Sequence, residues 1–298
     1  MDKRRYELLS CIKQRYADTN GSAAFQAAEA GPSASARQFY LRDLKDNLVR
    51  PMDERHVAEY SRGSGSELDG KMRALRSSSA MTFNLLGNQR CKVRRTDRAF
   101  ASLDYAIAYE YQIPTLRRGL PANLDAVLKG GRGDVVACEM KMLEWLTSVP
   151  AKLKGRYLEP ESYPFADSAP TFIEAAARLN ASPAFACYDF AQMFKHALAL
   201  HNAVRDGRLP AKGLVLLNCV WEPPESYGLT EETAGWVAQQ ARREHEGFQE
   251  FKQVMEPVER LFAHELGTSF SIEYLPASEL IDRLRHPDGE LARLMRYR

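Results

Sequence analysis

Alternating hydrophobic and polar positions predict three consecutive strands in the middle of the chain. Within residues 100–115, a tyrosine or isoleucine stands at every second position from Tyr105 to Tyr111, which is the period of a strand with one buried face. Residues 124–128 and 134–143 are almost continuously apolar, as strands covered on both faces are. The short segment between them contains three glycines, so we expect a tight reversal and an antiparallel pair.

The segments that follow predict helices and two further strands. Residues 188–205 have apolar positions at helical spacing, and residues 231–266 predict a long, mostly polar helix that is interrupted near Pro257. Residues 213–221 predict a buried strand, and residues 269–274 predict another strand. Helices that alternate with strands in this way predict an α/β protein with helices packed on a sheet.

These elements divide the chain into three predicted regions. Residues 1–60 predict an N-terminal helical extension, broken by a stretch rich in alanine, serine and glycine. Residues 61–222 contain the predicted sheet, and residues 223–298 add a helix and a strand that complete or cover this core. Residues 150–183 form a long insertion with a short helix, which we interpret as a substrate loop or lid.

Two charged residues lie within the third predicted strand. Glu139 and Lys141 are two positions apart, so their side chains point to the same face. Burying both is costly unless they meet a partner or a metal, and a structural ion pair is the alternative interpretation. Antiparallel pairing would bring Asp125 beside one of them, although the sequence leaves the register open. Two carboxylates near a lysine suit Mg²⁺, which takes a few carboxylate oxygens and keeps several waters.

This pattern resembles a known family. Asp125, followed by Glu139-x-Lys141, resembles the catalytic signature of the PD-(D/E)XK nuclease superfamily, whose fold is restriction-endonuclease-like. The predicted elements of residues 66–222 are also similar to the α-β-β-β-α-β core of that family, a mixed sheet flanked by helices. The sequence departs from the family name at Leu124, where that name implies proline.

The resemblance implies a metal-dependent nuclease. Asp125 and Glu139, aided by the Met140 carbonyl, would bind Mg²⁺ or in its place Mn²⁺. Lys141 would orient or help to deprotonate the attacking water. The implied substrate is DNA, with RNA as the weaker alternative. Many relatives that cut both strands act as homodimers.

Three further residues are assigned to the site by the same resemblance. Glu67 is expected in the first turn of a helix before the sheet, from which it would reach the metal site; a favourable charge at a helix N-terminus is the alternative. Gln192 and Lys195 share one face of the predicted helix 188–205 and would contact the active site or a phosphate. Their alternative is a solvated polar face.

Positive charge is concentrated in the first third of the chain. Residues 1–100 contain 19 lysines and arginines against 12 acidic residues, although the whole chain has a net charge of only +2. The densest basic run is Arg90–Arg98, in which Arg94 and Arg95 are candidate nucleic-acid contacts. A solvated connecting loop is the alternative.

Other chemistries and locations are disfavoured. The five cysteines are isolated, so neither a zinc knuckle nor a disulfide framework is expected. His196 and His201 are five positions apart, which does not match a zinc-binding helical pair. No apolar run approaches the ~18–20 residues that span a bilayer. No apolar signal segment follows the first residues, so we expect a cytoplasmic protein without membrane contact.

The sequence leaves open two alternatives to an active nuclease. The chain could have the nuclease fold and act as a catalytically inactive nucleic-acid-binding or assembly protein. It could also be an unrelated α/β protein in which Asp125, Glu139 and Lys141 form a structural ion network.

Overall fold

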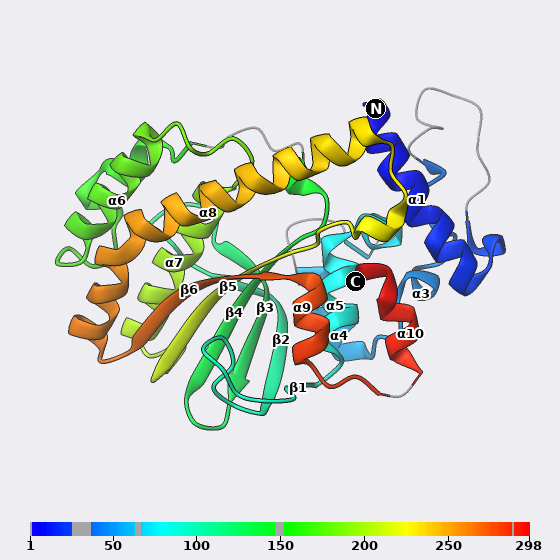
Figure 1. Ribbon diagram of the computed structural model, residues 1–298. Coiled ribbons are helices and arrows are strands. Elements are labelled where there is room, and N and C mark those ends of the chain that lie inside the picture. Colours follow the sequence, from blue (N-terminus) through cyan, green and yellow to red (C-terminus); the bar gives the residue numbers. More distant parts are fainter. Residues whose placement is uncertain (1, 26–36, 63–66, 69, 147–151, 288) are drawn as a thin grey trace.

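The protein is a mixed α/β structure in which a curled sheet lies between two groups of helices (Figure 1). The computed structural model describes residues 2–25, 37–62, 67–68, 70–146, 152–287 and 289–298. Both ends of the described chain lie on the same side of the sheet, near α1 and α10 (Figure 1).

The sheet has six strands in the order in which they occur along the chain. The first four are antiparallel neighbours, whereas β4, β5 and β6 are parallel to one another. The three central predicted strands and the two later ones are confirmed, with shifted ends, and the glycine-rich reversal joins β3 to β4. Their bounds are β1 Arg90–Lys92, β2 Asp104–Ile113, β3 Ala122–Gly130, β4 Asp134–Lys141, β5 Gly213–Val220 and β6 Ser269–Pro276.

Helices surround this sheet. The α-helices are α1 Lys3–Asn20, α3 Leu44–Asn47, α4 Glu54–Arg62, α5 Ser78–Leu86, α6 Ala169–Ala181, α7 Phe190–Arg205, α8 Glu231–Leu266, α9 Ala277–Arg283 and α10 Glu290–Leu294. Short 3₁₀ helices are η1 Ser22–Ala24, η2 Lys71–Arg73, η3 Glu144–Leu146, η4 Gly155–Leu158, η5 Pro160–Ser162, η6 Glu225–Tyr227 and η7 Met295–Tyr297. The short helix predicted within the 150–183 insertion is α6.

Each face of the sheet has its own hydrophobic core. Val135 and Ala137 of β4 pack on the side of α6, α7 and the C-terminal half of α8. Val136, Cys138 and Met140 pack on the other side, against α4, α5, α9 and the N-terminal helix α1. This alternation explains why β4 is nearly all apolar: both of its faces are covered by helices.

Two helix predictions are wrong in detail. Helix α8 is 36 residues long and is not interrupted at Pro257, although Figure 1 shows that it bends in its C-terminal part. Proline removes one backbone hydrogen bond, and the fully buried Val258 and Phe262 hold the following turns against the sheet. Glu67 does not begin a helix but lies in a turn before η2. The helix begins later because Ser77 caps α5, accepting the Ala80 N–H at 3.1 Å.

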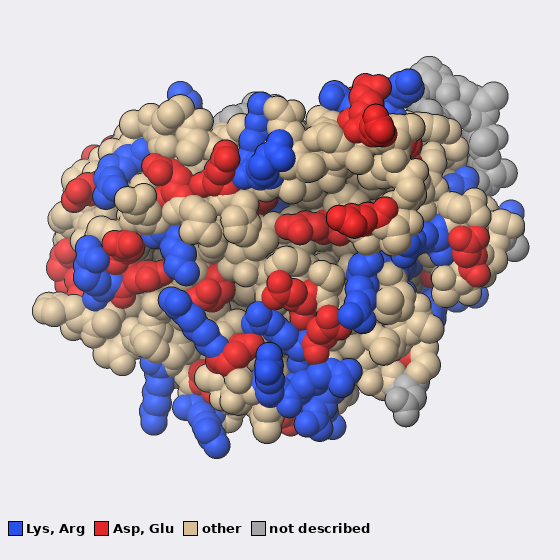
Figure 2. Space-filling model, in the orientation of Figure 1, with Lys and Arg blue, Asp and Glu red and all other residues tan. Residues whose placement is uncertain are grey.

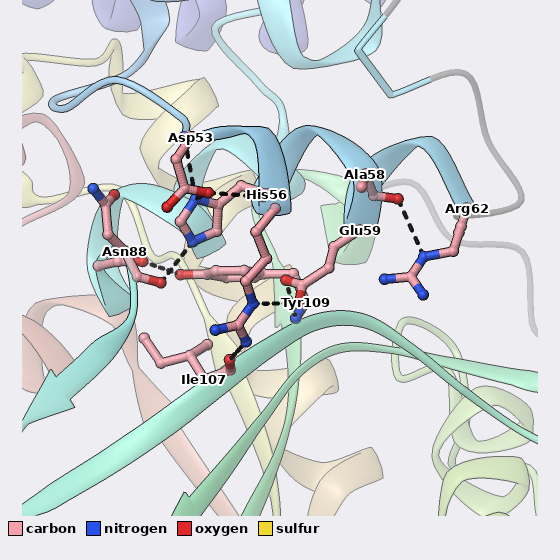
Figure 3. A network of polar contacts seen from close by, with 10 residues as sticks. Asp53, His56, Ala58, Glu59, Arg62, Asn88, Ile107 and Tyr109 are labelled. Atoms are coloured by element: carbon pink, nitrogen blue, oxygen red, sulfur yellow. Dashed lines mark hydrogen bonds and ion pairs between the residues drawn. The ribbon is translucent and has the colours of Figure 1, made fainter.

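Side chains of α4 cover the edge of β2 (Figure 3). The Glu59 carboxylate accepts the Tyr109 N–H at 3.1 Å, and Arg55 donates to the Ile107 carbonyl at 2.6 Å. Arg55 and Glu59 also pair with each other at 3.0 Å. The short strand β1 ends before this part of β2 and does not pair with it here. The side chains of Glu59 and Arg55 instead form hydrogen bonds with the backbone groups at this edge of the sheet.

Candidate active site

Strands β3 and β4 bring two carboxylates together where their pairing stops. The paired positions run from Lys129 with Val135 to Ala126 with Cys138, so Asp125 and Glu139 are the next residues on the two strands. The Asp125 carboxylate accepts the N–H of the residue after Glu139, Met140, at 2.7 Å. The Asp125 side chain therefore accepts the Met140 N–H in place of a backbone carbonyl of β3.

Glu139 is bound by two cationic or hydrogen-donating groups. Its Oε1 lies 2.7 Å from Lys141 Nζ, and its Oε2 lies 2.9 Å from His196 Nε2 of α7. The predicted shared face of Glu139 and Lys141 is confirmed. Burial raises the pKa of Glu139, but Lys141 and His196 outweigh it, so the net shift is downward.

Lys141 remains charged in spite of its burial. Burial lowers the pKa of this ammonium group, but Glu139, Glu144 and Asp189 more than compensate and raise it above its ordinary value. The ammonium also donates to Gln192 Oε1 at 2.5 Å. The sequence-predicted Gln192 therefore lies beside the Lys141 ammonium, which is a fixed positive charge at neutral pH.

A third carboxylate, Glu110, was missed by the sequence analysis. Tyr109 pairs with Ala126 and Tyr111 with Leu124, so Glu110 lies across from Asp125. Glu110 has a φ of 48°, rare for a residue with a side chain. Around it the chain changes face, because Tyr109 packs in one core and Tyr111 against the other.

Burial and neighbouring carboxylates raise the pKa of two acidic groups at the site. Burial raises the pKa of Glu110 to about 7, with contributions from Glu67 and Glu139, although a hydrogen bond from Asn123 opposes the shift. Burial and then Glu139 also raise the pKa of Asp125 well above its ordinary value. The centre therefore holds carboxyl groups whose ionisation burial opposes and a bound cation would favour.

Glu67 lies at the margin of this acidic centre. Its carboxylate contacts Lys71 Nζ at 3.4 Å and accepts the Ser79 hydroxyl at 2.9 Å. The charge of Glu67 contributes to the raised pKa of Glu110. The structure thus brings Glu67 toward the site from a turn, and not from the first turn of a helix.

The candidate nucleic-acid contacts separate into two places. Lys195 lies on α7, three residues beyond Gln192. Arg94 and Arg95 follow β1, which pairs with the first residues of β2, at the sheet end away from Asp125. Figure 2 shows Lys and Arg side chains gathered in this region, around β1. Arg94 is also tied to the backbone, because its Nε donates to the Leu284 carbonyl at 2.9 Å.

Few protein groups at this site could bind a cation. Within the described ranges, no group of three or more His, Cys, Asp or Glu residues is arranged to hold a metal ion. Asp125 and Glu139 remain as a pair of carboxylates, and Mg²⁺ commonly uses one or two protein carboxylates together with waters and substrate phosphate. The residues therefore fit a site that substrate and water complete.

The structure combines a mixed α/β fold with an Asp, a Glu and a Lys that converge on adjacent strands. The family model described as "Restriction Endonuclease associating with ARP" matches residues 11–263. The chain belongs to this family, which confirms the resemblance to PD-(D/E)XK nucleases and indicates nuclease activity in general. No curated protein and no solved structure matches the chain significantly. Over the part of the chain that the structure describes, no helix has the length and apolarity needed to cross a membrane.

Proposed function

We propose that this protein is a metal-dependent nuclease that hydrolyses phosphodiester bonds in DNA. The observation that carries the proposal is the convergence of Asp125, Glu139 and Lys141 where β3 and β4 part. The antiparallel β2–β3–β4 unit followed by parallel β5 supports a restriction-endonuclease-like topology.

Asp125 and Glu139 would hold Mg²⁺ or Mn²⁺, with the Met140 carbonyl as a further ligand. Such an ion, when bound, lowers the pKa of a coordinated water and neutralises charge on the phosphate. Burial raises the pKa of Asp125, and a neighbouring cation would favour its ionised form. His196 holds the Glu139 carboxylate from the side of α7.

Lys141 would act as a cation and not as a base. Its raised pKa keeps the ammonium protonated, so it can donate to a phosphate oxygen or to the attacking water. Gln192 holds the ammonium from α7 and would keep it directed at the substrate. Glu110, with a pKa near 7, can accept a proton at neutral pH, and Glu67 would act on the site through it.

Cleavage of supercoiled plasmid and of labelled single strands tests the proposal. Wild type should cut with Mg²⁺ or Mn²⁺ and not with EDTA. Asp125→Asn keeps an acceptor for the Met140 N–H but loses the charge, so it should remain folded and cut far more slowly. If the lost ligand contributed about 4 kcal/mol to transition-state stabilisation, the rate would fall roughly a thousandfold.

Asp104→Asn is the matched control, because Asp104 lies at the start of β2 and pairs with Arg90 at the surface. It should cut at the wild-type rate. Cleavage by Asp125→Asn at the wild-type rate would contradict the proposal. DNA binding in EDTA, with no cleavage when Mg²⁺ or Mn²⁺ is present, would favour the alternative of a catalytically inactive binding or assembly protein. The family description names an association with ARP, which is a reason to test this alternative.

A further inference from the structure

A basic pocket of about 440 Å³ opens next to the candidate active site. Its walls come from the loop between β2 and β3, the segment that leads into η4, and α7. The residues that line it include no Asp or Glu. Its basic members are Arg118, Lys152, Lys154, Arg156 and Lys195.

The pocket lies at the sheet end where the carboxylates converge. Strand β2 ends at Ile113 and β3 begins at Ala122, three residues before Asp125. On α7, Lys195 is three residues, or ~4.5 Å along the axis, from Gln192, which holds Lys141. A substrate strand at the carboxylates would therefore run towards this pocket along the same end of the sheet.

Hydrogen bonds tie the walls of the pocket to the rest of the fold. Asn202 of α7 donates to the Thr115 carbonyl at 2.6 Å, and the Arg117 N–H donates to the Ser162 carbonyl at 2.8 Å. The Leu153 N–H donates to Asn180 Oδ1 of α6 at 2.9 Å, and the Asn180 amide donates back at 3.0 Å. The backbone that carries the basic side chains is thus held in place by hydrogen bonds to neighbouring segments.

Gly119 allows Arg156 to lie close to the loop. A Cβ on Gly119 would lie 2.7 Å from Arg156 Nη1, which is closer than side-chain carbons approach other atoms. The φ of Gly119 is 131°, which is also unfavourable for other residues. The glycine therefore leaves the space that the guanidinium fills.

The charge of this pocket is uncompensated. Among the residues that the structure describes, none of its five basic side chains forms an ion pair with an acidic residue. Some arginines elsewhere on the surface are paired, such as Arg205 with Asp167 and Arg208 with Asp206. Five clustered cations repel one another, so an anion bound among them would be favoured.

We propose that this pocket binds phosphate groups of the nucleic-acid strand next to the bond that is cut. The inference rests on the proposed function and specifies how its substrate lies. The rim supports a nucleic acid over a small anion, because Leu120 lines the pocket and is 88% exposed, offering apolar surface to sugars and bases.

Binding of a fluorescein-labelled DNA duplex in EDTA, measured by anisotropy over a salt series, tests the pocket apart from catalysis. The double variant Arg118→Ala/Arg156→Ala should bind at least tenfold more weakly at low salt. The slope of log affinity against log salt should fall by about 2, because each lost phosphate contact removes roughly 0.9. Arg208→Ala/Arg260→Ala removes two charges outside the pocket and should bind as wild type does.

Unchanged DNA affinity in the pocket variant, or no DNA binding by wild type, would overturn the inference. Displacement of DNA by inorganic phosphate at a concentration equal to that of the DNA phosphates would also overturn it, because the site would then hold a small anion. Failure of the proposed function has a different signature: wild type would bind DNA through the pocket and cut nothing with Mg²⁺ or Mn²⁺. If the proposed function holds, cleavage by the pocket variant should recover at high enzyme concentration, whereas cleavage by Asp125→Asn should not.

Discussion

The Glu139 carboxylate lies between His196 Nε2, at 2.9 Å from one oxygen, and Lys141 Nζ, at 2.7 Å from the other. The histidine comes from α7 and is 57 positions away in sequence. Because Glu139 and His196 are buried, these contacts fix the orientation of the carboxylate before any substrate is present. In the proposed mechanism this makes His196 a positioning residue for Glu139.

Removal of the His196 donor should weaken metal binding. In His196→Leu, one oxygen of Glu139 loses its partner and the carboxylate can rotate, so we expect Mn²⁺ affinity to fall about 10–100-fold. Isothermal titration calorimetry would measure the change. His196→Gln retains a terminal amide donor and should recover most of the affinity. Equal Mn²⁺ affinity in wild type and His196→Leu would show that the contact only supports the fold.

Glu244 should make the protein less stable as the pH rises. This α8 carboxyl is 2% exposed, and burial raises its pKa from 4.5 to about 7. The folded state therefore holds its proton more tightly than the unfolded state does. Stability from this group is complete below pH 4.5 and is lost as the pH rises through 7.

The variant Glu244→Gln removes this dependence and retains a polar side chain near Asn218. Urea unfolding would measure the free energy of unfolding of both proteins at pH 4.5 and at pH 8. Between these two pH values, the free energy of unfolding of the variant should rise by about 3 kcal/mol relative to that of wild type. Glu246→Gln, on the exposed face of the same helix, is the control and should follow wild type. A parallel pH dependence in wild type and Glu244→Gln would refute the prediction.

The contact of α4 with β2 predicts a loss of stability on truncation. Glu59→Ala leaves the buried Tyr109 N–H without its acceptor, and we expect the free energy of unfolding to fall by about 1–3 kcal/mol. Glu59→Gln keeps an oxygen for this N–H and should lose less. Chemical denaturation measures both. Equal losses in the two variants would assign the effect to the Arg55 ion pair instead.

The sequence alone determined the features that depend on local geometry. Strand side chains alternate over two residues, so Glu139 and Lys141 had to share a face of β4. The glycines between β3 and β4 specify a short reversal, which places Asp125 near Glu139 by chain connectivity. The helical period likewise put Gln192 and Lys195 on one face of α7.

Only the tertiary structure decided which distant groups meet. Glu110 reaches the acidic centre because β2 changes face there at a positive φ, and simple alternation from Tyr105 to Tyr111 conceals such a change. His196 contacts Glu139 because α7 packs on the sheet with this face of the helix turned towards β4. The spacing of residues along the sequence does not specify that orientation of the helix. The basic pocket joins Arg118, Arg156 and Lys195 from three segments, so it depends on how the β2–β3 loop, η4 and α7 pack together.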